Sequence, residues 1–399
     1  MVTVKKSMLL VGMALIAAMC ISGQGGRGNN IAWWAAGAVQ GAADTGESSK
    51  KVVGTEKDIQ QLIKQADADG GGIISLLEGI YILHDRISLE DIQNVTIIGH
   101  PGGTELRAAK ELVGTVGKNA AVGQKYIELQ DKVEFAKGMT VEIQTQGAGK
   151  QDFFRAVVAG VDGTRIKLTA PLEYVVPSGT KVIGAYNGFW GCSGTANIRL
   201  EDITINMNRE EWPIPPRNHT CHCAILCQGL YSYETGPVGA AVENFKVVNC
   251  IIKNAHHRGI SWYNIANSEV CNCLIVDAGD KLNAEAIGFD HFARNCKAVG
   301  NTVINSHIEL NDASDCLVKD NVIVNVKTGI WLWRWFTKLP NLCVRNKIVG
   351  NVIYKASKTG IRIAGDDNEI TDNKMVDCAE GVNISGAGNI VLRNKCVEE

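Results

Sequence analysis

Short runs of apolar residues recur along the second half of the chain, and an asparagine stands in each run. A first series comprises Asn249, Asn272, Asn301, Asn321, Asn351, Asn373 and Asn394, at intervals of 20 to 30 residues. A second series lies five residues before the first and comprises Asn244, Asn267, Cys296, Cys316, Asn346, Asn368 and Asn389. Such self-similarity is typical of a solenoid, in which each repeat buries its apolar face only against its neighbours. The pattern predicts stacked coils that keep their strands and vary their loops.

Each repeat also contains a second predicted strand, in which apolar residues occupy alternate positions. The inward pairs are Ile260 and Trp262, Ile287 and Phe289, Ile308 and Leu310, Ile330 and Leu332, Ile361 and Ile363, and Val382 and Ile384. Because side chains alternate across a strand, the residues between and after these pairs should face outward. They form one column of Ser261, Gly288, Glu309, Trp331, Arg362 and Asn383, and another of Tyr263, Asp290, Asn311, Trp333, Ala364 and Ser385. We expect both columns on a solvent-facing wall of the stack.

The segment before the repeats predicts a cap and an insertion. Residues 51–110 are expected to form an N-terminal cap and the first coils, since Thr55 and Asp58 make a capping-box-like helix start. Helical spacing follows at Ile59, Leu62, Ile63 and Ala66. Residues 111–183 lose the repeat, and alternating segments around an Asp162-Gly163 turn predict a small antiparallel β insertion. The repeats then fill residues 184–399 without an evident C-terminal cap, so oligomerisation through the last coil is a further expectation.

The first residues have the pattern of an export signal. Lys5 and Lys6 precede an apolar run from Met8 to about Ile21, which is too short to span a membrane. We predict a signal peptide over residues 1–22 and a linker rich in Gly, Ala and Ser over residues 23–50. The expected location is secreted, periplasmic or on the cell surface. Lipid anchoring through Cys20 is the alternative, although Met19 stands where lipoproteins carry a small residue.

Composition narrows the partners of the chain. It has 399 residues, is 45% apolar and carries a formal net charge of -2, which gives no reason to expect a nucleic-acid partner. Thirteen cysteines in an exported protein would ordinarily indicate disulfides. Most of them occupy repeat-matched positions, such as Cys250 and Cys273, so we interpret them as free, buried small hydrophobes. An occasional bridge between adjacent coils is the alternative.

The features above resemble right-handed parallel β-helix proteins of the pectin-lyase-like kind. The resemblance rests on the asparagine ladders, the Gly-Ile strand starts and the helix followed by Gly-rich strands, over roughly residues 55–108 and 184–399. This fold hosts lyases, hydrolases, epimerases and inert adhesins, so it does not select an activity. The string from Glu285 to His291 also resembles the Gly-Phe-Asp-Pro-His segment of alginate C5-epimerases. That resemblance implies catalytic roles for Asp290 and, without the intervening proline, for His291.

Ionisable and aromatic residues gather on the outward wall between residues 256 and 334. The catalytic candidates are Asp290, His291, His257, Arg258, Glu309 and Arg334. The substrate-binding candidates are Tyr263, Lys281, Glu285, Asn311, Asp312, Trp331 and Trp333. Neighbouring coils lie about 4.8 Å apart, so equivalent positions in adjacent coils reach the same ligand. Flat aromatic faces suit stacking on pyranose rings, with a protein partner as the alternative.

Three functions fit this wall. The first is a polysaccharide lyase or C5-epimerase that removes the C5 proton of a uronic acid, with Arg258 or Arg334 neutralising the carboxylate and His257, His291, Lys281 or Tyr263 as the base. The second is an inverting glycoside hydrolase, since the backbones of Asp290 and Glu309 should lie about 8 Å apart. The third is a non-catalytic carbohydrate-binding or adhesion protein. The expected partner is a polysaccharide.

A metal site is not predicted from the cysteines and histidines. The cluster His219, Cys221, His222, Cys223 and Cys227 has the ligand types of a zinc site but not a familiar zinc spacing. The need for Ca²⁺ as a cofactor is left open.

Overall fold

The structure is a computed structural model that describes residues 51–145, 152–279, 284–340 and 342–398. The predicted signal peptide, the predicted linker and Lys281 lie outside the described residues. The coils, the cap and the insertion all belong to one compact unit, Val52–Glu399. Within its described part, no helix is both long and apolar enough to cross a bilayer.

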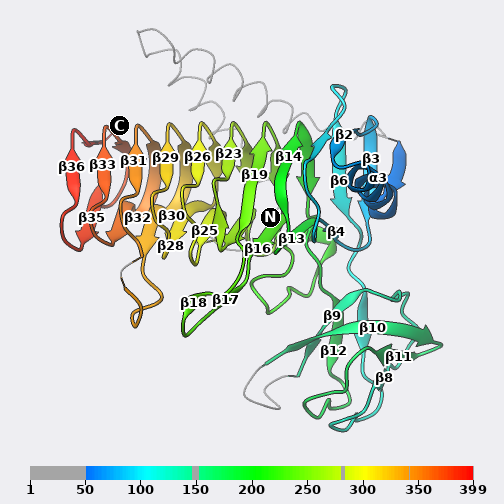
Figure 1. The fold of residues 1–399 in the computed structure, drawn as a ribbon. Helices are drawn as coiled ribbons and strands as arrows, with labels where there is room; N and C mark the ends of the chain where they lie inside the picture. Colours follow the sequence, from blue (N-terminus) through cyan, green and yellow to red (C-terminus); the bar gives the residue numbers. More distant parts are fainter. Residues whose placement is uncertain (1–50, 146–151, 280–283, 341, 399) are drawn as a thin grey trace. The chain divides into compact units, whose positions relative to one another are not determined.

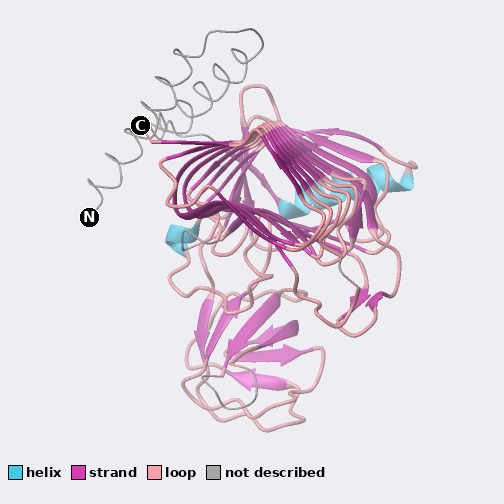
Figure 2. Ribbon diagram, turned by 90° about the vertical axis from the view of Figure 1, so that its left-hand side faces the viewer, coloured by secondary structure: helices cyan, strands magenta, loops and turns pink. Residues whose placement is uncertain are grey.

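The fold is a right-handed parallel β-helix, as predicted. One coil consists of β23 (Glu269–Cys271), β24 (Leu274–Val276) and β25 (Glu285–Asp290). Its successor consists of β26 (Lys297–Val299), β27 (Thr302–Ile304) and β28 (His307–Asn311). Corresponding strands of the two coils pair in parallel. Figure 1 shows the coils stacked along the chain from green to red, and Figure 2 shows strands of successive coils overlying one another.

The strands form three parallel ladders, each named after its strand in the first of these two coils. The β25 ladder contains β4 (Ile87–Ser88), β13 (Phe189–Cys192), β16 (Ile225–Gln228), β21 (Ile260–Tyr263), β25, β28, the ends of β30 (Val322–Trp333) and β32 (Val352–Ala364), and β35 (Val382–Ser385). The β24 ladder contains β1 (Val52–Thr55), β3 (Gly79–Leu83), β6 (Thr104–Ala108), β15 (Ile203–Asn206), β20 (Ile251–Lys253), β24, β27, the starts of β30 and β32, β34 (Lys374–Val376) and β37 (Lys395–Val397). The β23 ladder contains β2 (Gly72–Ser75), β5 (Val95–Ile98), β14 (Ala196–Glu201), β19 (Val242–Val248), β23, β26, β29 (Leu317–Lys319), β31 (Lys347–Val349), β33 (Glu369–Thr371) and β36 (Ile390–Leu392), and β22 (Ile265–Ala266) pairs with β19.

The predicted helical cap and the β insertion are both present. Helix α3 (Glu56–Ala68) begins with a capping box, in which Thr55 N–H donates to Asp58 Oδ2 at 2.7 Å. Its buried face holds Ile59 and Ile63, and Figure 1 places the helix beside the first coils. The insertion is an antiparallel sheet of β7 (Val113–Thr115), β8 (Tyr126–Glu128), β9 (Thr140–Gln144), β10 (Phe154–Asp162), β11 (Arg165–Leu168) and β12 (Lys181–Gly184).

The asparagines form a hydrogen-bonded ladder, but part of each predicted series was misaligned by one residue. Side-chain amides donate from coil to coil at 2.8–2.9 Å in the order Asn301, Asn321, Asn351, Asn373 and Asn394. The predicted members Asn249 and Asn272 of the first series, and Asn244 and Asn267 of the second, instead adopt left-handed backbone with φ between 51° and 55°. In the coil before Asn301, the ladder position belongs to Cys273, the residue after Asn272. Its N–H donates to Asn301 Oδ1 at 2.9 Å. Asparagine suits both places, because its amide stacks well and its backbone tolerates positive φ.

Packing confirms which residues of the β25 ladder face inward. The predicted inward residues from Ile260 to Ile363 are fully buried in the main core. Pairing also confirms the outward columns, for example Ser261 with Gly288, Gly288 with Glu309, and Glu309 with Trp331. The expectation of a solvent-facing wall was wrong for the middle coils, where Tyr263, Asp290 and Glu309 are only 1–3% exposed. These side chains point away from the core, but loops cover them.

The cysteines behave as predicted. All twelve within the described residues are free, and eight of these are buried. Cys250, Cys273, Cys296 and Cys316 lie in the core of the coil stack. At the last described coil, Ile384 and Val391 are 36% and 40% exposed, although their positions are buried in earlier coils. Oligomerisation through this coil stays a prediction.

Candidate functional site

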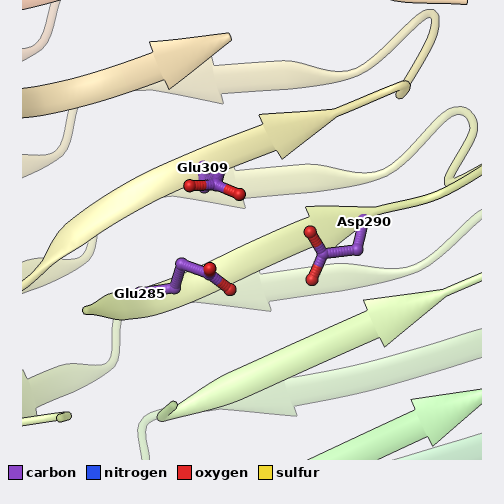
Figure 3. Close-up of side chains that lie close together, drawn as sticks. All are labelled: Glu285, Asp290 and Glu309. Atoms are coloured by element: carbon purple, nitrogen blue, oxygen red, sulfur yellow. The ribbon is translucent and has the colours of Figure 1, made fainter. Parts of the chain in front are cut away.

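Three acidic side chains meet on the outward face of the β25 ladder (Figure 3). Glu285 and Asp290 come from β25 and Glu309 from β28, and one carboxylate oxygen of each lies within 4.8 Å of the others. Strand alternation alone would not bring Glu285 to this face. An irregular register between Glu285 and Ile287 pairs Glu285 with His307, which lies two residues before Glu309 on the same face. We call Glu285, Asp290 and Glu309 the carboxylate cluster.

A buried arginine holds the carboxylate cluster together. Arg258, at the entry to β21, places Nε 2.6 Å from Glu285 Oε2 and Nη1 2.8 Å from Asp290 Oδ2. The same Nη1 donates to Ser261 Oγ at 2.9 Å and to the Tyr263 hydroxyl. Ser261 Oγ in turn donates to Asp290 Oδ2 at 3.1 Å. The guanidinium therefore neutralises much of the local negative charge, since buried charges must be paired.

The environment favours the protonated form of two of the three acids. Burial, and then the charge of Asp290, raises the pKa of Glu309 to about 8. Burial also raises the pKa of Glu285 well above its ordinary value, although Arg258 opposes that shift. At neutral pH the cluster thus combines the ion pair of Arg258 and Asp290 with a carboxylic acid, Glu309, that can donate a proton.

The raised pKa of Glu309 predicts a pH-dependent stability. The folded protein keeps this proton up to about pH 8, whereas the unfolded chain loses it near 4.5. The contribution of this group to stability is therefore fully present below pH 4.5 and is lost as the pH rises to about 8. The free energy of unfolding should fall by on the order of 3–5 kcal/mol over this range. Relative to wild type, Glu309→Gln should gain stability across this range in urea unfolding.

The control for this measurement is Glu201→Gln. The hydrogen bond from Arg199 lowers the pKa of Glu201, so stability from this group is present above pH 4.5 and lost as pH falls. The stability of Glu201→Gln relative to wild type should change with pH in the opposite sense to that of Glu309→Gln. A difference between Glu309→Gln and wild type that does not change with pH would contradict the assignment.

Gly288 provides the space in which the carboxylates meet. A Cβ at this position would lie 2.8 Å from Glu285 Oε2 and 3.0 Å from Asp290 Oδ2. Gly288→Ala should therefore lower the free energy of unfolding by about 1–3 kcal/mol, because Arg258 restrains both carboxylates. Gly160→Ala is the matched control, since its Cβ would meet no atom within 4 Å. Equal effects in the two variants, measured by urea unfolding, would rule out this packing argument.

His307 was missed in the sequence although it belongs to the site. Its Nε2 lies 3.1 Å from Glu309 Oε2, and its side chain is 1% exposed. Burial lowers the pKa of His307, so the ring is neutral at pH 7. The available signal was its position two residues before Glu309, which places both side chains on one face.

Aromatic residues from separate loops pack over Tyr263 and His291, beside the carboxylate cluster, and we call this cover the aromatic roof. It consists of the hairpin β17 (Tyr231–Ser232) to β18 (Gly236–Pro237), the segment 334–340 and Phe292. The His291 ring packs beneath it, with ring centroids 5.6 Å from Tyr231 and 4.8 Å from Phe336. Burial lowers the pKa of His291, so it is a neutral ring. Tyr231 and Tyr233 were not identified from the sequence, because nothing local places their loop over a distant strand.

Other predicted residues support the roof rather than the cluster. Arg334 donates to the carbonyls of Phe336, Thr337 and Leu339 and so shapes segment 334–340. Asp312 accepts from the N–H groups of Trp335 and Phe336 at 2.9 and 3.1 Å. Asp312 therefore anchors the same segment.

The remaining predicted residues lie beside the cluster. His257 Nε2 lies 2.6 Å from the carbonyl of Pro216, in the loop before β16. Asn311 is buried next to Asp290 in the second column, and its Oδ1 has no hydrogen-bond partner in the described part of the chain. Trp331 and Trp333 stack at 5.3 Å and are half-buried.

The donor set of the cluster suits a hard cation better than a soft one. Within the described ranges, the carboxylate cluster is the one group of three or more acidic, histidine or cysteine ligands close enough to hold a metal. Carboxylates suit Ca²⁺, Mg²⁺ or Mn²⁺, whereas copper prefers imidazole and sulfur. Arg258 already stands where such a cation would bind, at 2.6 and 2.8 Å from two of the acids. A cation would have to compete with this guanidinium.

Comparisons with known proteins leave the activity open. The family described as periplasmic copper-binding protein (NosD) matches residues 234–393. No curated protein matches the sequence significantly. Among solved structures, a polygalacturonase from Erwinia carotovora ssp. carotovora is 10% identical with a TM-score of 0.46, covering 85% of this chain and 82% of that one. A protein titled glycoside hydrolase is 11% identical with a TM-score of 0.44, covering 85% and 92%.

The solved structures similar to this chain also include an epimerase module. The A-module of the mannuronan C-5 epimerase AlgE6 from Azotobacter vinelandii is 11% identical with a TM-score of 0.31, covering 88% of this chain and 98% of that one. These structural similarities are too weak to support any argument about activity. The chain itself is a parallel β-helix, as its sequence predicts.

Proposed function

We propose that the protein is a glycoside hydrolase that cleaves a polysaccharide at the carboxylate cluster. The main support is the pairing of two unlike carboxyl groups, Asp290 and Glu309, with oxygens within 4.8 Å of each other. Glu309 keeps its proton at neutral pH because burial raises its pKa to about 8. Asp290 is ion-paired with Arg258. Unlike environments for two neighbouring acids are what acid–base catalysis requires.

The spacing favours a double displacement. Retaining enzymes hold their carboxyl groups about 5–5.5 Å apart and inverting enzymes about 6.5–9.5 Å. Because one oxygen of Asp290 lies within 4.8 Å of one of Glu309, we propose a retaining pair, with the inverting pair as the alternative. In the first step Glu309 donates its proton to the glycosidic oxygen, and Asp290 bonds to the anomeric carbon as that C–O bond breaks. Asp290 Oδ1 has no hydrogen-bond partner among the described residues and suits this role. In the second step Glu309 takes a proton from water, which displaces Asp290.

The structure gives less support to a lyase in which Arg258 neutralises the carboxylate of a uronic acid. That role needs a guanidinium available for the substrate carboxylate, but Arg258 already pairs with Glu285 and Asp290. A lyase or C5-epimerase is therefore the second candidate. It is favoured by the neutral ring of His291, whose centroid lies 5.3 Å from that of Tyr263. A base and a hydroxyl so placed suit C5 proton transfer.

Access to either candidate site requires a covering segment to move, because Glu309 is 3% exposed. The hairpin that carries Tyr231 is joined to the coils by loops, and such segments are the usual movable covers of active sites. We also propose an exported, periplasmic location, which the description of the matching family supports. We assign no copper site, since the donors that converge are carboxylates.

The test is product analysis on a panel of neutral and acidic polysaccharides. A hydrolase releases reducing ends without near-ultraviolet absorbance, and the retaining pair predicts that the anomer first formed keeps the configuration of the substrate. Unsaturated products that absorb in the near ultraviolet would establish a lyase instead. Uronate inversion without cleavage would establish an epimerase. Binding without either reaction would indicate a carbohydrate-binding protein.

A further inference from the structure

We propose that Arg362 and Trp331 form an anion-binding subsite next to the carboxylate cluster. The substrate would then be a heteropolysaccharide with an acidic sugar at this subsite and an uncharged sugar at the cluster. The inference rests on the proposed function for the position of cleavage and adds the class of substrate.

The subsite is aligned with the cluster by strand register. Glu309 pairs with Trp331, and Trp331 pairs with Arg362, so the three stand in one outward column of the β25 ladder. Two coils separate Glu309 from Arg362, which corresponds to roughly 10 Å along the stack. That span is within the reach of a disaccharide unit. A chain lying along the ladder would meet both positions at once.

Exposure changes sharply along this column. Glu309 is buried, Trp331 is half-buried and Arg362 is exposed. The Arg362 guanidinium lies 5.5 Å from the centroid of the Trp331 ring, in a cation–π contact. A flat indole offers a surface for the C–H face of a sugar, and the guanidinium fork suits a carboxylate or sulfate. The contact orients the guanidinium without removing its charge.

The neighbouring acid is Glu380, whose pKa is lowered by hydrogen bonds from Asn383 and Thr359 and, to a smaller extent, by the charge of Arg362. The carboxylate of Glu380 accepts from Thr359 Oγ1 at 3.0 Å and from Asn383 Nδ2 at 2.7 Å. Across the described residues, no ion pair joins Arg362 to Glu380. An anionic ligand group would therefore meet a guanidinium that Glu380 attracts but does not hold in an ion pair.

The cluster itself suits an uncharged sugar. Its arginine, Arg258, already pairs with Glu285 and Asp290, so an anionic ring there would meet acids whose cation is already taken up. Asp290 Oδ1 and Asn311 Oδ1 have no partner in the described part of the chain, and both side chains are buried. Sugar hydroxyls are donors that would satisfy these acceptors. The two positions therefore differ in the charge that they accept.

The experiment compares acidic heteropolysaccharides with their carboxyl-reduced forms. Hyaluronan, chondroitin and gellan are the probes, and binding is followed by tryptophan fluorescence and titration calorimetry. We expect at least one acidic polymer to bind about tenfold more tightly than its reduced form, with the difference shrinking as salt is added. Arg362→Gln should remove this preference and leave binding of the reduced form unchanged. Arg345→Gln is the charge-matched control, because Arg345 pairs with Asp315 before β31.

The outcomes separate this inference from the proposed hydrolysis. Preferred binding of the acidic form through Arg362, without release of reducing ends, would support the subsite and contradict the hydrolase. Equal binding or equal cleavage of both forms by wild type and Arg362→Gln would overturn the subsite and leave hydrolysis intact. Failure of all three acidic probes to bind would also overturn it.

Discussion

Replacing Arg258 with methionine is expected to lower the free energy of unfolding by about 3–5 kcal/mol. The substitution leaves Glu285 and Asp290 buried without their shared cation, and an uncompensated buried charge is strongly destabilising. Urea unfolding followed by tryptophan fluorescence measures the effect. Adding Asp290→Asn to the same chain should recover part of the loss, because it removes the unpaired charge.

The control for Arg258 is an ion pair of similar length at the surface. Arg199 lies 2.7 Å from Glu201, but their side chains are 35% and 22% exposed. Arg199→Met should therefore cost no more than about 1 kcal/mol. Equal losses in the two methionine variants would show that burial of the Arg258 pair contributes nothing to stability.

Replacing Glu309 with glutamine is expected to reduce glycoside cleavage by about 10²–10⁴-fold while the fold is retained. The amide cannot donate the proton that the leaving oxygen needs, and loss of a general acid has an effect of this size. Wild-type activity should also decline above about pH 8, where Glu309 loses its proton. The measurement is the rate of reducing-end release as a function of pH.

A charge-matched variant separates catalysis from structure. Glu369→Gln removes a carboxylate that pairs with Lys347 on the β23 ladder, away from the cluster. Its rate and pH profile should match those of wild type. Full activity in Glu309→Gln would remove Glu309 as the general acid. An unchanged alkaline decline in a residually active Glu309→Gln would assign that decline to another group.

The arrangement of the candidate site was largely readable from the alternation of apolar residues. The columns that bring Tyr263 beside Asp290 and both near Glu309 follow from one choice of inward residues, and the pairing of strands confirms them. The sequence did not fully determine which asparagines belong to the hydrogen-bonded ladder. An amide stacked inside the coil and an amide on a left-handed turn are the same residue type, so composition could not separate Asn301 from Asn272.

Two features of the site depend on contacts between distant segments. The roof forms because the hairpin at Tyr231 and the segment after β30 meet over His291. No local sequence pattern predicts where either loop packs. Glu285 reaches the cluster only through an irregular strand register, which strict alternation does not foresee.

The sequence by itself determined the coils, their capping helix and the residues that leave the core, because a period of two and a repeated length are local properties of the chain. Tertiary structure alone decided that this outward face is covered and that Arg258 pairs with Glu285 and Asp290. Burial and ion pairing depend on which segments meet in space, and the protonation of Glu309 follows from them.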